Sequence, residues 1–286
     1  MTVLLALSAS LLWGLADFGG GALARRLPAL AVVVASQVAA AAVLLAAVIA
    51  TGGWAAASPV LWYAVAAGVI GPFAMLAFYR ALALGPMGVV SPLTTVSVVV
   101  PVGVGLALGD RPGPGQVAGI AVAVAGVVLA AGPERGGPAA ARSALLLTLG
   151  AAVGFGTVMA LIAHASTGGG LLLALCVQRV CNVAVGGAAL LTGPRGAGGS
   201  GTGRLLPGLR ARLPALTAIG LADVAANALF AMASHRGSAT VAAVLSSLYP
   251  VVTALMARGV FKERLRPVQV LGAGLAVAGT LLLAAA

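Results

Sequence analysis

The stretch DRPGPGQVAGIAVAVAG at residues 110–126 returns later in the chain as ERLRPVQVLGAGLAVAG at residues 263–279. A single shift of 153 residues aligns an acidic-basic pair, a Gln-Val pair and two glycines, which in the first copy are Asp110-Arg111, Gln116-Val117, Gly119 and Gly126. Several matches at one shift indicate an internal repeat, and a repeat determines the whole fold rather than one segment of it.

The repeat extends toward the N-terminus at slightly different shifts. A shift of 152 residues aligns 85–95 with 237–247, and the matching positions of the first copy are Gly85, Val89, Leu93 and Thr94-Thr95. A shift of 142 residues pairs Gly14 with Gly156, Trp13 with Phe155, and Ser36-Gln37 with Gln178-Arg179. We therefore predict a duplicated chain with a first repeat at 1–132, a linker at 133–142 and a second repeat at 143–286.

The composition indicates that both repeats lie in lipid. Of the 286 residues, 61% are hydrophobic and 7% are charged, whereas a soluble domain carries about 25% charged residues. Soluble enzymes and disordered chains are therefore excluded. Since a helix needs about 20 apolar residues to cross the hydrocarbon core, the chain divides into ten predicted spans, at 2–24, 29–50, 59–80, 87–108, 115–132, 143–163, 170–192, 213–234, 238–258 and 267–285. We predict an all-α, multi-pass integral protein of a cell membrane, with a bacterial plasma membrane as the expected location.

Each repeat has five spans, and five is an odd number. The second repeat must therefore cross the membrane in the opposite sense to the first, which relates the halves by a pseudo-two-fold axis in the membrane plane. An inverted duplication has two alternative packings, one open to each face, and this is the basis of alternating access. Inverted repeats also occur in channels, but a receptor or an intramembrane hydrolase has no comparable need for one.

The formal net charge of +11 comes from 16 Lys and Arg against 5 acidic residues. Most of the basic residues lie in short gaps between spans rather than in one stripe, so nucleic-acid binding is not predicted. Thirteen of the sixteen follow odd-numbered spans. By the positive-inside rule, those connections would be cytoplasmic and both termini would lie outside.

Some of these residues form a wider pattern. Gly85-x-x-x-Val89, the run Ser246 to Val251, and then Glu263-Arg264, Gln269, Gly272 and Gly279 resemble the EamA branch of the drug/metabolite transporter superfamily, and Trp13-Gly14 is similar to that family's first-helix motif. The resemblance implies a secondary carrier for a small metabolite, amino acid or drug, often an exporter, with its pathway between the halves. It also implies cytoplasmic termini, so the orientation stays open. Asp110 and Gln37 depart from the family, which usually has Glu and often has Arg at these positions.

Few ionisable side chains lie inside the spans, where each is costly unless it is paired or faces water. Arg179 and Asp223 lie at matched depth in the seventh and eighth spans. They predict either a structural ion pair or a site for a substrate or coupling ion. Asn182 and Asn227 follow them by about one helical turn, so two polar faces are expected to meet.

Asp17 is the third intramembrane charge, and it precedes Gly19-Gly20-Gly21. These glycines predict a weakened helix near its end, where carriers often place binding groups. Pairing of Asp17 with Arg25 or Arg26, or capping of backbone amides, is the alternative. Asp17 and Asp223 are the acids away from span ends, which makes them the candidates for proton coupling.

Further residues complete the predicted pathway. Trp13, Gln37 and Tyr249 are assigned to the substrate or ion path. Prolines free backbone carbonyls and kink helices, and those predicted to act as hinges or kinks are Pro92, Pro101 and Pro250, of which Pro92 and Pro250 are placed at equivalent positions.

No enzyme is predicted, because the sequence has no Gly-x-Ser-x-Gly elbow, no His-Glu-x-x-His motif and no Walker lysine motif. No metal or cofactor is expected. Glu263 is expected to pair locally with Arg264. The alternative to a carrier of a small molecule is a non-transporting membrane scaffold or a lipid scramblase.

Overall fold

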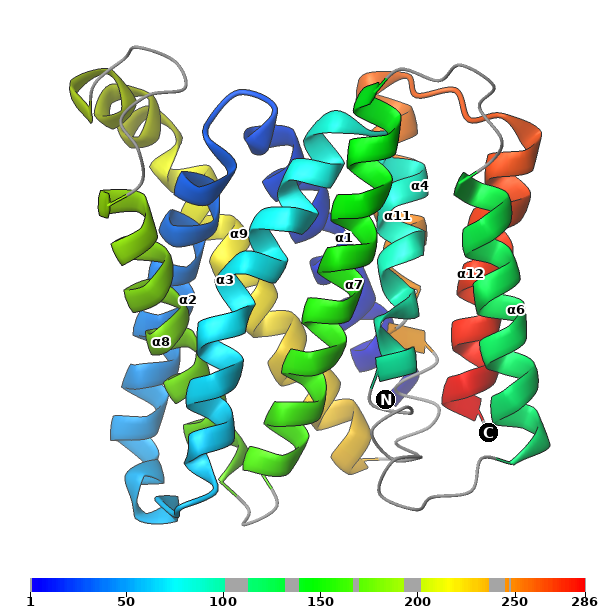
Figure 1. Cartoon of the computed structure of the whole chain (residues 1–286). Helices are drawn as coiled ribbons and strands as arrows, with labels where there is room; N and C mark the ends of the chain where they lie inside the picture. Colours follow the sequence, from blue (N-terminus) through cyan, green and yellow to red (C-terminus); the bar gives the residue numbers. More distant parts are fainter. Residues whose placement is uncertain are drawn as a thin grey trace.

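The computed structural model describes residues 2–100, 113–131, 139–166, 170–192, 202–236, 245–246 and 248–285. All regular structure in these ranges is helical (Figure 1). The first half consists of α1 (Thr2–Ala24), α2 (Ala29–Thr51), the 3-10 helix η1 (Gly53–Ala56), α3 (Leu61–Leu84), α4 (Met87–Thr94), the 3-10 helix η2 (Thr95–Val98) and α6 (Pro114–Ala131). The second half consists of α7 (Ala139–Ala165), α8 (Leu171–Thr192), α9 (Thr202–Arg236), α11 (Tyr249–Phe261) and α12 (Pro267–Ala285).

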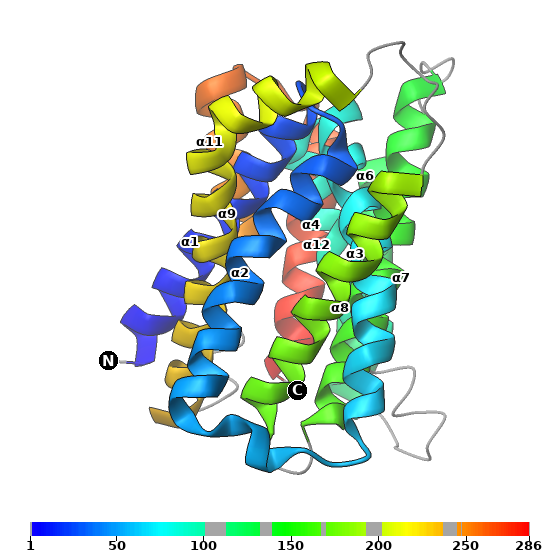
Figure 2. The same ribbon diagram turned by 90° about the vertical axis from the view of Figure 1, so that its left-hand side faces the viewer.

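These helices follow the predicted spans. Among the described residues, six helices are long and apolar enough to cross a membrane, and four shorter apolar helices lie in the fourth, fifth, ninth and tenth spans. A helix satisfies its own backbone hydrogen bonds, which is why hydrocarbon accepts it. The prediction of an all-α membrane protein is confirmed. The largest difference is in α9, which begins at Thr202 rather than at residue 213 and whose first turns lie across the upper end of the bundle (Figure 2).

The two halves have opposite orientations. Both ends of the chain lie at the lower end of the bundle in Figures 1 and 2. Helix α1 rises from that end, whereas α7, the first helix of the second half, descends toward it (Figure 1). The five-helix halves are therefore inverted, as the odd number of spans predicts.

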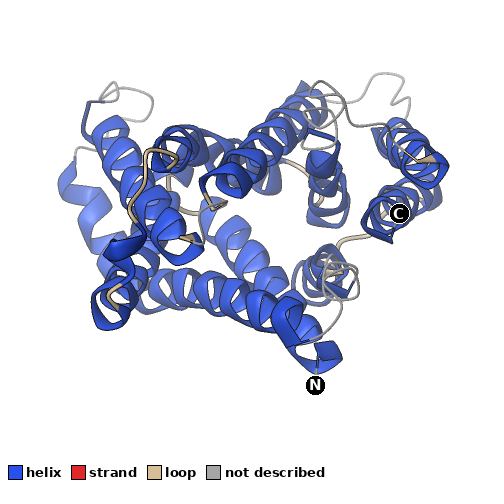
Figure 3. Ribbon diagram, turned by 90° about the horizontal axis from the view of Figure 1, so that it is seen from below, coloured by secondary structure: helices blue, strands red, loops and turns tan. Residues whose placement is uncertain are grey.

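Helix packing repeats across the pseudo-two-fold axis. Helix α1 packs on α9 as α7 packs on α3, and α2 packs on α9 as α8 packs on α3. Two further pairs join equivalent helices of the two halves, namely α2 with α8 and α6 with α12. Helix α4 packs on α11, so the fourth and ninth spans also meet. The α2–α8 and α6–α12 pairs form opposite edges of the bundle (Figure 1), and the view from below shows the α6–α12 pair at one side (Figure 3).

The same two-fold relation is visible in single contacts between a glycine and a backbone carbonyl. Gly14 of α1 lies against the carbonyl of Tyr249, and Gly156 of α7 lies against the carbonyl of Ser97. The 142-residue shift relates Gly14 to Gly156, and the 152-residue shift relates Ser97 to Tyr249. The two contacts are therefore equivalent in the repeat. A Cβ on either glycine would overlap its partner, so both contacts require glycine for the same reason.

A second pair of contacts obeys the same shifts. Gly220 of α9 lies against the carbonyl of Ser36, and Gly68 of α3 lies against the carbonyl of Gln178. These contacts hold α2 to α9 and α8 to α3. The inverted repeat that the sequence predicts is therefore present in the packing of individual residues.

The fourth and ninth spans are interrupted near their middles. Helix α4 ends at Thr94 and continues as the tighter η2, and α11 begins at Tyr249 after a turn at Leu248. The 152-residue shift places both interruptions at equivalent positions. Helix α4 contains Pro92, whose carbonyl accepts a hydrogen bond of 2.7 Å from Thr95 Oγ1. Transporters often place such discontinuous helices at the substrate site.

Two sequence-based expectations about helix breaks are wrong. Gly19-Gly20-Gly21 do not interrupt α1, which continues to Ala24. Gly20 provides room for the ring of Tyr79. Pro250 lies in the first turn of α11 rather than inside a helix, and a proline costs little there. The shift of 152 pairs Pro250 with Val98, so Pro92 and Pro250 are not equivalent. Pro101 lies outside the described residues.

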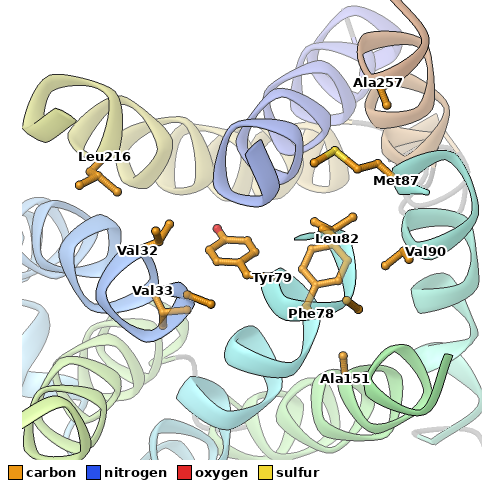
Figure 4. Close-up of a cluster of buried hydrophobic side chains, with 12 residues drawn as sticks. Val32, Val33, Phe78, Tyr79, Leu82, Met87, Val90, Ala151, Leu216 and Ala257 are labelled. Carbon is orange, nitrogen blue, oxygen red and sulfur yellow. The ribbon is translucent and has the colours of Figure 1, made fainter. Parts of the chain in front are cut away.

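The largest apolar cluster lies where the halves meet (Figure 4). It combines residues from α2, α3, α4, α7, α9 and α11, which are Ala29, Val32, Val33, Phe78, Tyr79, Ala81, Leu82, Met87, Val90, Ala151, Leu216 and Ala257. The ring of Tyr79 is inside this cluster, and its hydroxyl points toward α1. The cluster therefore holds the Tyr79 hydroxyl beside α1, near the centre of the bundle.

Candidate substrate site

The centre of the bundle holds an ion pair between α8 and α9. Arg179 Nη2 lies 2.7 Å from Asp223 Oδ2, and the two side chains retain 12% and 20% of their accessible surface. Asn227, one turn after Asp223, donates from Nδ2 to the Asp223 carbonyl at 2.7 Å and to Oδ1 at 3.2 Å. The structure therefore brings together Arg179, Asp223 and Asn227. Buried charges of this kind are stable only as a hydrogen-bonded group.

The same arginine contacts its own repeat equivalent. Arg179 Nη1 donates to Oε1 of Gln37 in α2, and Gln37 is buried. The 142-residue shift makes Gln37 and Arg179 equivalent positions. A residue can meet its own equivalent only at the symmetry axis, so the ion pair lies beside the pseudo-two-fold axis, where both halves contribute side chains.

The acidic residues do not follow the symmetry. The repeat shifts place Gly71 opposite Asp223 and Met159 opposite Asp17. Both carboxyl groups therefore belong to the α1–α9 side of the axis, and the α3–α7 side has no counterpart. A site with this asymmetry presents different chemistry to the two halves.

Asn182 lies one turn after Arg179 in α8. Its side chain is buried against Gly71 of α3. Among the described residues, Asn182 Oδ1 and Arg179 Nε have no hydrogen-bond partner. Buried polar atoms without a partner cost about 1–3 kcal/mol each, so a water or a bound solute that hydrogen-bonds to either atom would be stabilising.

Asp17 lies close to this pair and is not neutralised by it. Its charge is near enough to interact with that of Asp223 and with the hydroxyls of Tyr79 and Tyr249. Within the described ranges, no basic side chain forms an ion pair with Asp17, and Arg25 pairs with Glu263 instead. The predicted alternative of an Asp17–Arg25 pair is therefore wrong. The centre contains two carboxyl groups and one guanidinium.

Aromatic rings form one wall beside Asp17. The ring of Trp13 in α1 lies 5.8 Å from that of Phe230 in α9 and 6.3 Å from that of Tyr249 in α11. The symmetry-related pair, Phe155 with Phe78, has rings 5.5 Å apart. Trp13 and Asp17 are one turn apart on α1, so an indole and a carboxyl face the same region.

An apolar pocket leads to the ion pair from the lower part of the bundle. Its volume is about 180 Å³, and it lies between α8 and α9 with Leu44 of α2 beside it. Arg179 and Asn227 line it together with Leu172, Leu175, Val224 and Ala228, among others. Helix α2 packs on α3, whereas this pocket separates the equivalent helices α8 and α9. The two sides of the axis thus differ in how open they are.

Sequence reasoning did not assign Tyr79 to the site. Its hydroxyl lies against Ser36 of α2, and its ring covers Gly20 of α1, three residues beyond Asp17. The hydroxyl of Tyr249 lies near Thr94, at the end of α4. A tyrosine in the middle of an apolar span is a weak signal, because packed tyrosines are common.

Comparison with known proteins agrees with this architecture. The model of the EamA-like transporter family matches residues 1–132 and 142–285. The chain belongs to the EamA-like transporter family. No curated protein sequence matches it. Eight solved chains match it, and one of them, a crystal structure described only as that of a protein, covers 99% of this chain and 96% of its own length with a TM-score of 0.61 and 18% identity. At that identity, the likeness shows a shared fold alone.

Membership of the EamA-like family fixes the broad class. The protein is a multi-pass membrane transporter of the drug/metabolite transporter superfamily, and the family is not one of enzymes. A transporter of this family has a small-molecule substrate and works in a lipid bilayer.

Proposed function

We propose that this EamA-like protein is a secondary active carrier that moves a small metabolite, amino acid or drug by alternating access between its inverted halves. Export is the direction that the family resemblance implies. The two halves are taken as residues 1–132 and 143–286, joined by the linker at 133–142. The Arg179–Asp223 pair beside the symmetry axis carries the proposal, because a site on the axis is the one place that both alternative packings can expose equally.

The proposed binding groups surround that pair. Arg179 would bind an anionic or carbonyl group of the solute, and Asp223 with Asn227 would bind a donor such as an amine. Gln37 and Asn182 are assigned to the same polar centre, and Trp13 and Tyr249 to its aromatic wall. The unpaired Arg179 Nε and Asn182 Oδ1 support the assignment, since a solute can complete their hydrogen bonds.

Asp17 is proposed as the coupling carboxyl. It lies in the centre without an ion-pair partner among the described residues, whereas Asp223 has Arg179. An uncompensated carboxylate in a membrane interior is costly, so Asp17 gains from binding either a proton or a cationic solute. A group that exchanges the two can couple solute movement to a pH gradient.

Pro92 and Pro250 are proposed to act at the interruptions of the fourth and ninth spans, with Pro101 further along the fourth. Both interruptions lie at equivalent positions in the two halves. Helices that are already broken can bend there at little cost in hydrogen bonds. A change in these bends would move α4 and α11 relative to the central site.

Solute counterflow in proteoliposomes tests the proposal. A panel of amino acids and cationic drugs is screened with and without a pH gradient, and Asp223→Asn and Arg179→Gln serve as comparison proteins. Exchange in the wild type that both folded variants lose supports the carrier and its site. Exchange that both variants retain would make the pair structural. If no solute moves under any gradient, the scaffold or scramblase alternative gains, and a dithionite assay with fluorescent phospholipids separates those two.

A further inference from the structure

A second ion pair joins the two halves at the upper face of the bundle. Arg25, in the turn between α1 and α2, places Nη2 2.9 Å from Oε1 of Glu263, which follows α11. Arg25 Nη2 also donates to the carbonyl of Leu82 at 3.4 Å, and its guanidinium lies 4.2 Å from the centre of the Phe261 ring. One arginine thus contacts the end of α3 and the end of α11. A guanidinium is suited to such combined ionic and stacking contacts.

The carboxylate has a second role in the same contact. Glu263 Oε2 accepts a hydrogen bond of 3.3 Å from the backbone N–H of Gly88, in the first turn of α4. The expected local pairing of Glu263 with Arg264 is therefore wrong. Glu263 instead connects the second half to two elements of the first half. Such a contact must change if the halves move apart at this face.

The ion pair lies above the central site, at the upper end of α1. Arg25 lies eight residues beyond Asp17, which is about 12 Å along the helical rise. Between them, Phe18 of α1 lies 5.5 Å from Phe261 of α11, ring to ring. Leu265 packs against Gly88 on the other side of Glu263. The upper face thus combines an ion pair with apolar contacts below it.

The sequence of the repeat does not provide the same residues for a contact at the opposite face. The 142-residue shift pairs Arg25 with Thr167 and Phe18 with Ala160, and Leu108-Gly109 stand where the second half has Phe261. The acidic position is kept as Asp110. The register therefore supplies no equivalent cation and no equivalent aromatic pair, and the apolar pocket that reaches Arg179 lies toward that lower face.

We propose that the Arg25–Glu263 pair is a latch that holds the upper face closed and that it breaks when the central site opens to that face. The proposal rests on the proposed alternating access, but it can be tested without a known solute. A hollow of about 550 Å³ lined by Arg25, Gly85, Glu263 and Arg264, among others, gives water and ions access to the pair. Salt should therefore weaken the latch by screening.

The test measures thiol accessibility at both faces in the full-length protein. The native cysteines are first replaced, as Cys176→Ala and Cys181→Ala. One reporter is Ser91→Cys, a conservative change at a buried site one turn below Gly88 in α4. The other is Leu175→Cys, which lines the pocket between α8 and α9. The rate of reaction with a small charged methanethiosulfonate reagent is measured for each reporter separately.

Glu263→Gln removes the charge but keeps an oxygen that can accept the Gly88 N–H bond. We expect the reaction at Ser91→Cys to become about fivefold faster and that at Leu175→Cys to become slower, as for loss of an ion pair of modest strength. Arg25→Gln should have the same effect. Arg264→Gln, which removes a neighbouring charge without touching the pair, is the matched control and should leave both rates unchanged.

A faster reaction at Ser91→Cys together with a slower reaction at Leu175→Cys identifies a shift from one alternative state to the other. A faster reaction at both reporters would indicate local loosening or misfolding, and unchanged rates in both variants would show that the pair is no latch; either result overturns the proposal. Raising NaCl from about 0.05 M to about 1 M provides a test without substitution, since the Debye length falls to about 3 Å. The salt effect should disappear in Glu263→Gln. Solute counterflow that persists alongside unchanged labelling would reject the latch and leave the carrier function standing.

Discussion

The Arg179–Asp223 pair makes separable predictions about stability and transport. Replacing one partner, as in Arg179→Gln or Asp223→Asn, leaves the other charge in a membrane interior. Uncompensated buried charges typically cost about 3–5 kcal/mol. Because the side chains keep 12% and 20% of their accessible surface, solvent screens the remaining charge and we expect a smaller cost, about 2–3 kcal/mol for each single variant.

The double variant Arg179→Gln/Asp223→Asn removes both charges and leaves two amides that can hydrogen-bond to each other. Its stability should return to within about 1 kcal/mol of the wild type, because replacing both members of a buried pair is often near neutral. A double-mutant cycle then gives a coupling energy of about 3–6 kcal/mol, at or above the upper end of the range for contacting residues. Unfolding in mixed detergent micelles, followed by circular dichroism, measures all four proteins.

Transport should not follow stability in this series. If the pair binds the solute, counterflow is lost in the double variant even though its stability is restored. A purely structural pair predicts the opposite, with transport recovering together with stability. A double variant that is stable and exchanges solute at the wild-type rate would refute the assignment of the site.

Further variants test the other parts of the account. Asp17→Asn should abolish acceleration of transport by a pH gradient while leaving solute exchange at equal pH in place, and loss of both activities would indicate a solute contact rather than a coupling role. Gly220→Ala should destabilise the protein by about 1–3 kcal/mol through overpacking against the Ser36 carbonyl, whereas Gly187→Ala, where a Cβ meets no atom within 4 Å, should be neutral in thermal unfolding. Trp13→Ala should raise the half-saturating solute concentration more than Phe155→Ala does, since the repeat makes these aromatic positions equivalent but places the carboxyl groups beside Trp13 alone; equal effects would argue against a one-sided site.

The fold could be predicted because a duplication leaves a constant shift in the sequence. Shifts of 142, 152 and 153 residues fix five spans per half, and the odd number fixes the inversion. The same shifts also relate contacts that no single motif reveals. The ring pair Trp13–Phe230 and its counterpart Phe155–Phe78 are examples. Equivalent residues in an inverted repeat have equivalent neighbours, so the pattern extends from helices to side chains.

The polar centre could be predicted only in part. Arg179 and Asp223 were found because charges at matched depth in apolar spans are rare and must be neutralised. The contact between Gln37 and Arg179 is implied by their equivalence, but only the packing places both on the axis. Tyr79 could not be assigned to the centre from the sequence, since its position depends on the room left by Gly20 on another helix.

Contacts between distant connections could not be predicted. Glu263 is adjacent to Arg264 in sequence, and local pairing is the simplest expectation. In the structure it pairs with Arg25 across 238 residues and accepts the Gly88 N–H bond. Loop residues at a helix-bundle face are brought together by the packing of whole helices. The hydrophobic periodicity of the sequence does not predict which loop residues will be in contact.

Trans-stimulated uptake tests the central claim most directly. Labelled solute is added outside proteoliposomes that contain the wild-type protein and are either loaded with unlabelled solute or left empty, with the Arg179→Gln/Asp223→Asn variant in parallel. Alternating access predicts a transient accumulation of label above equilibrium in loaded vesicles only, because each inward step is coupled to an outward return of the site. The stable double variant should show no such overshoot. Equal uptake into loaded and empty vesicles, without an overshoot, would contradict a carrier and indicate a channel-like path.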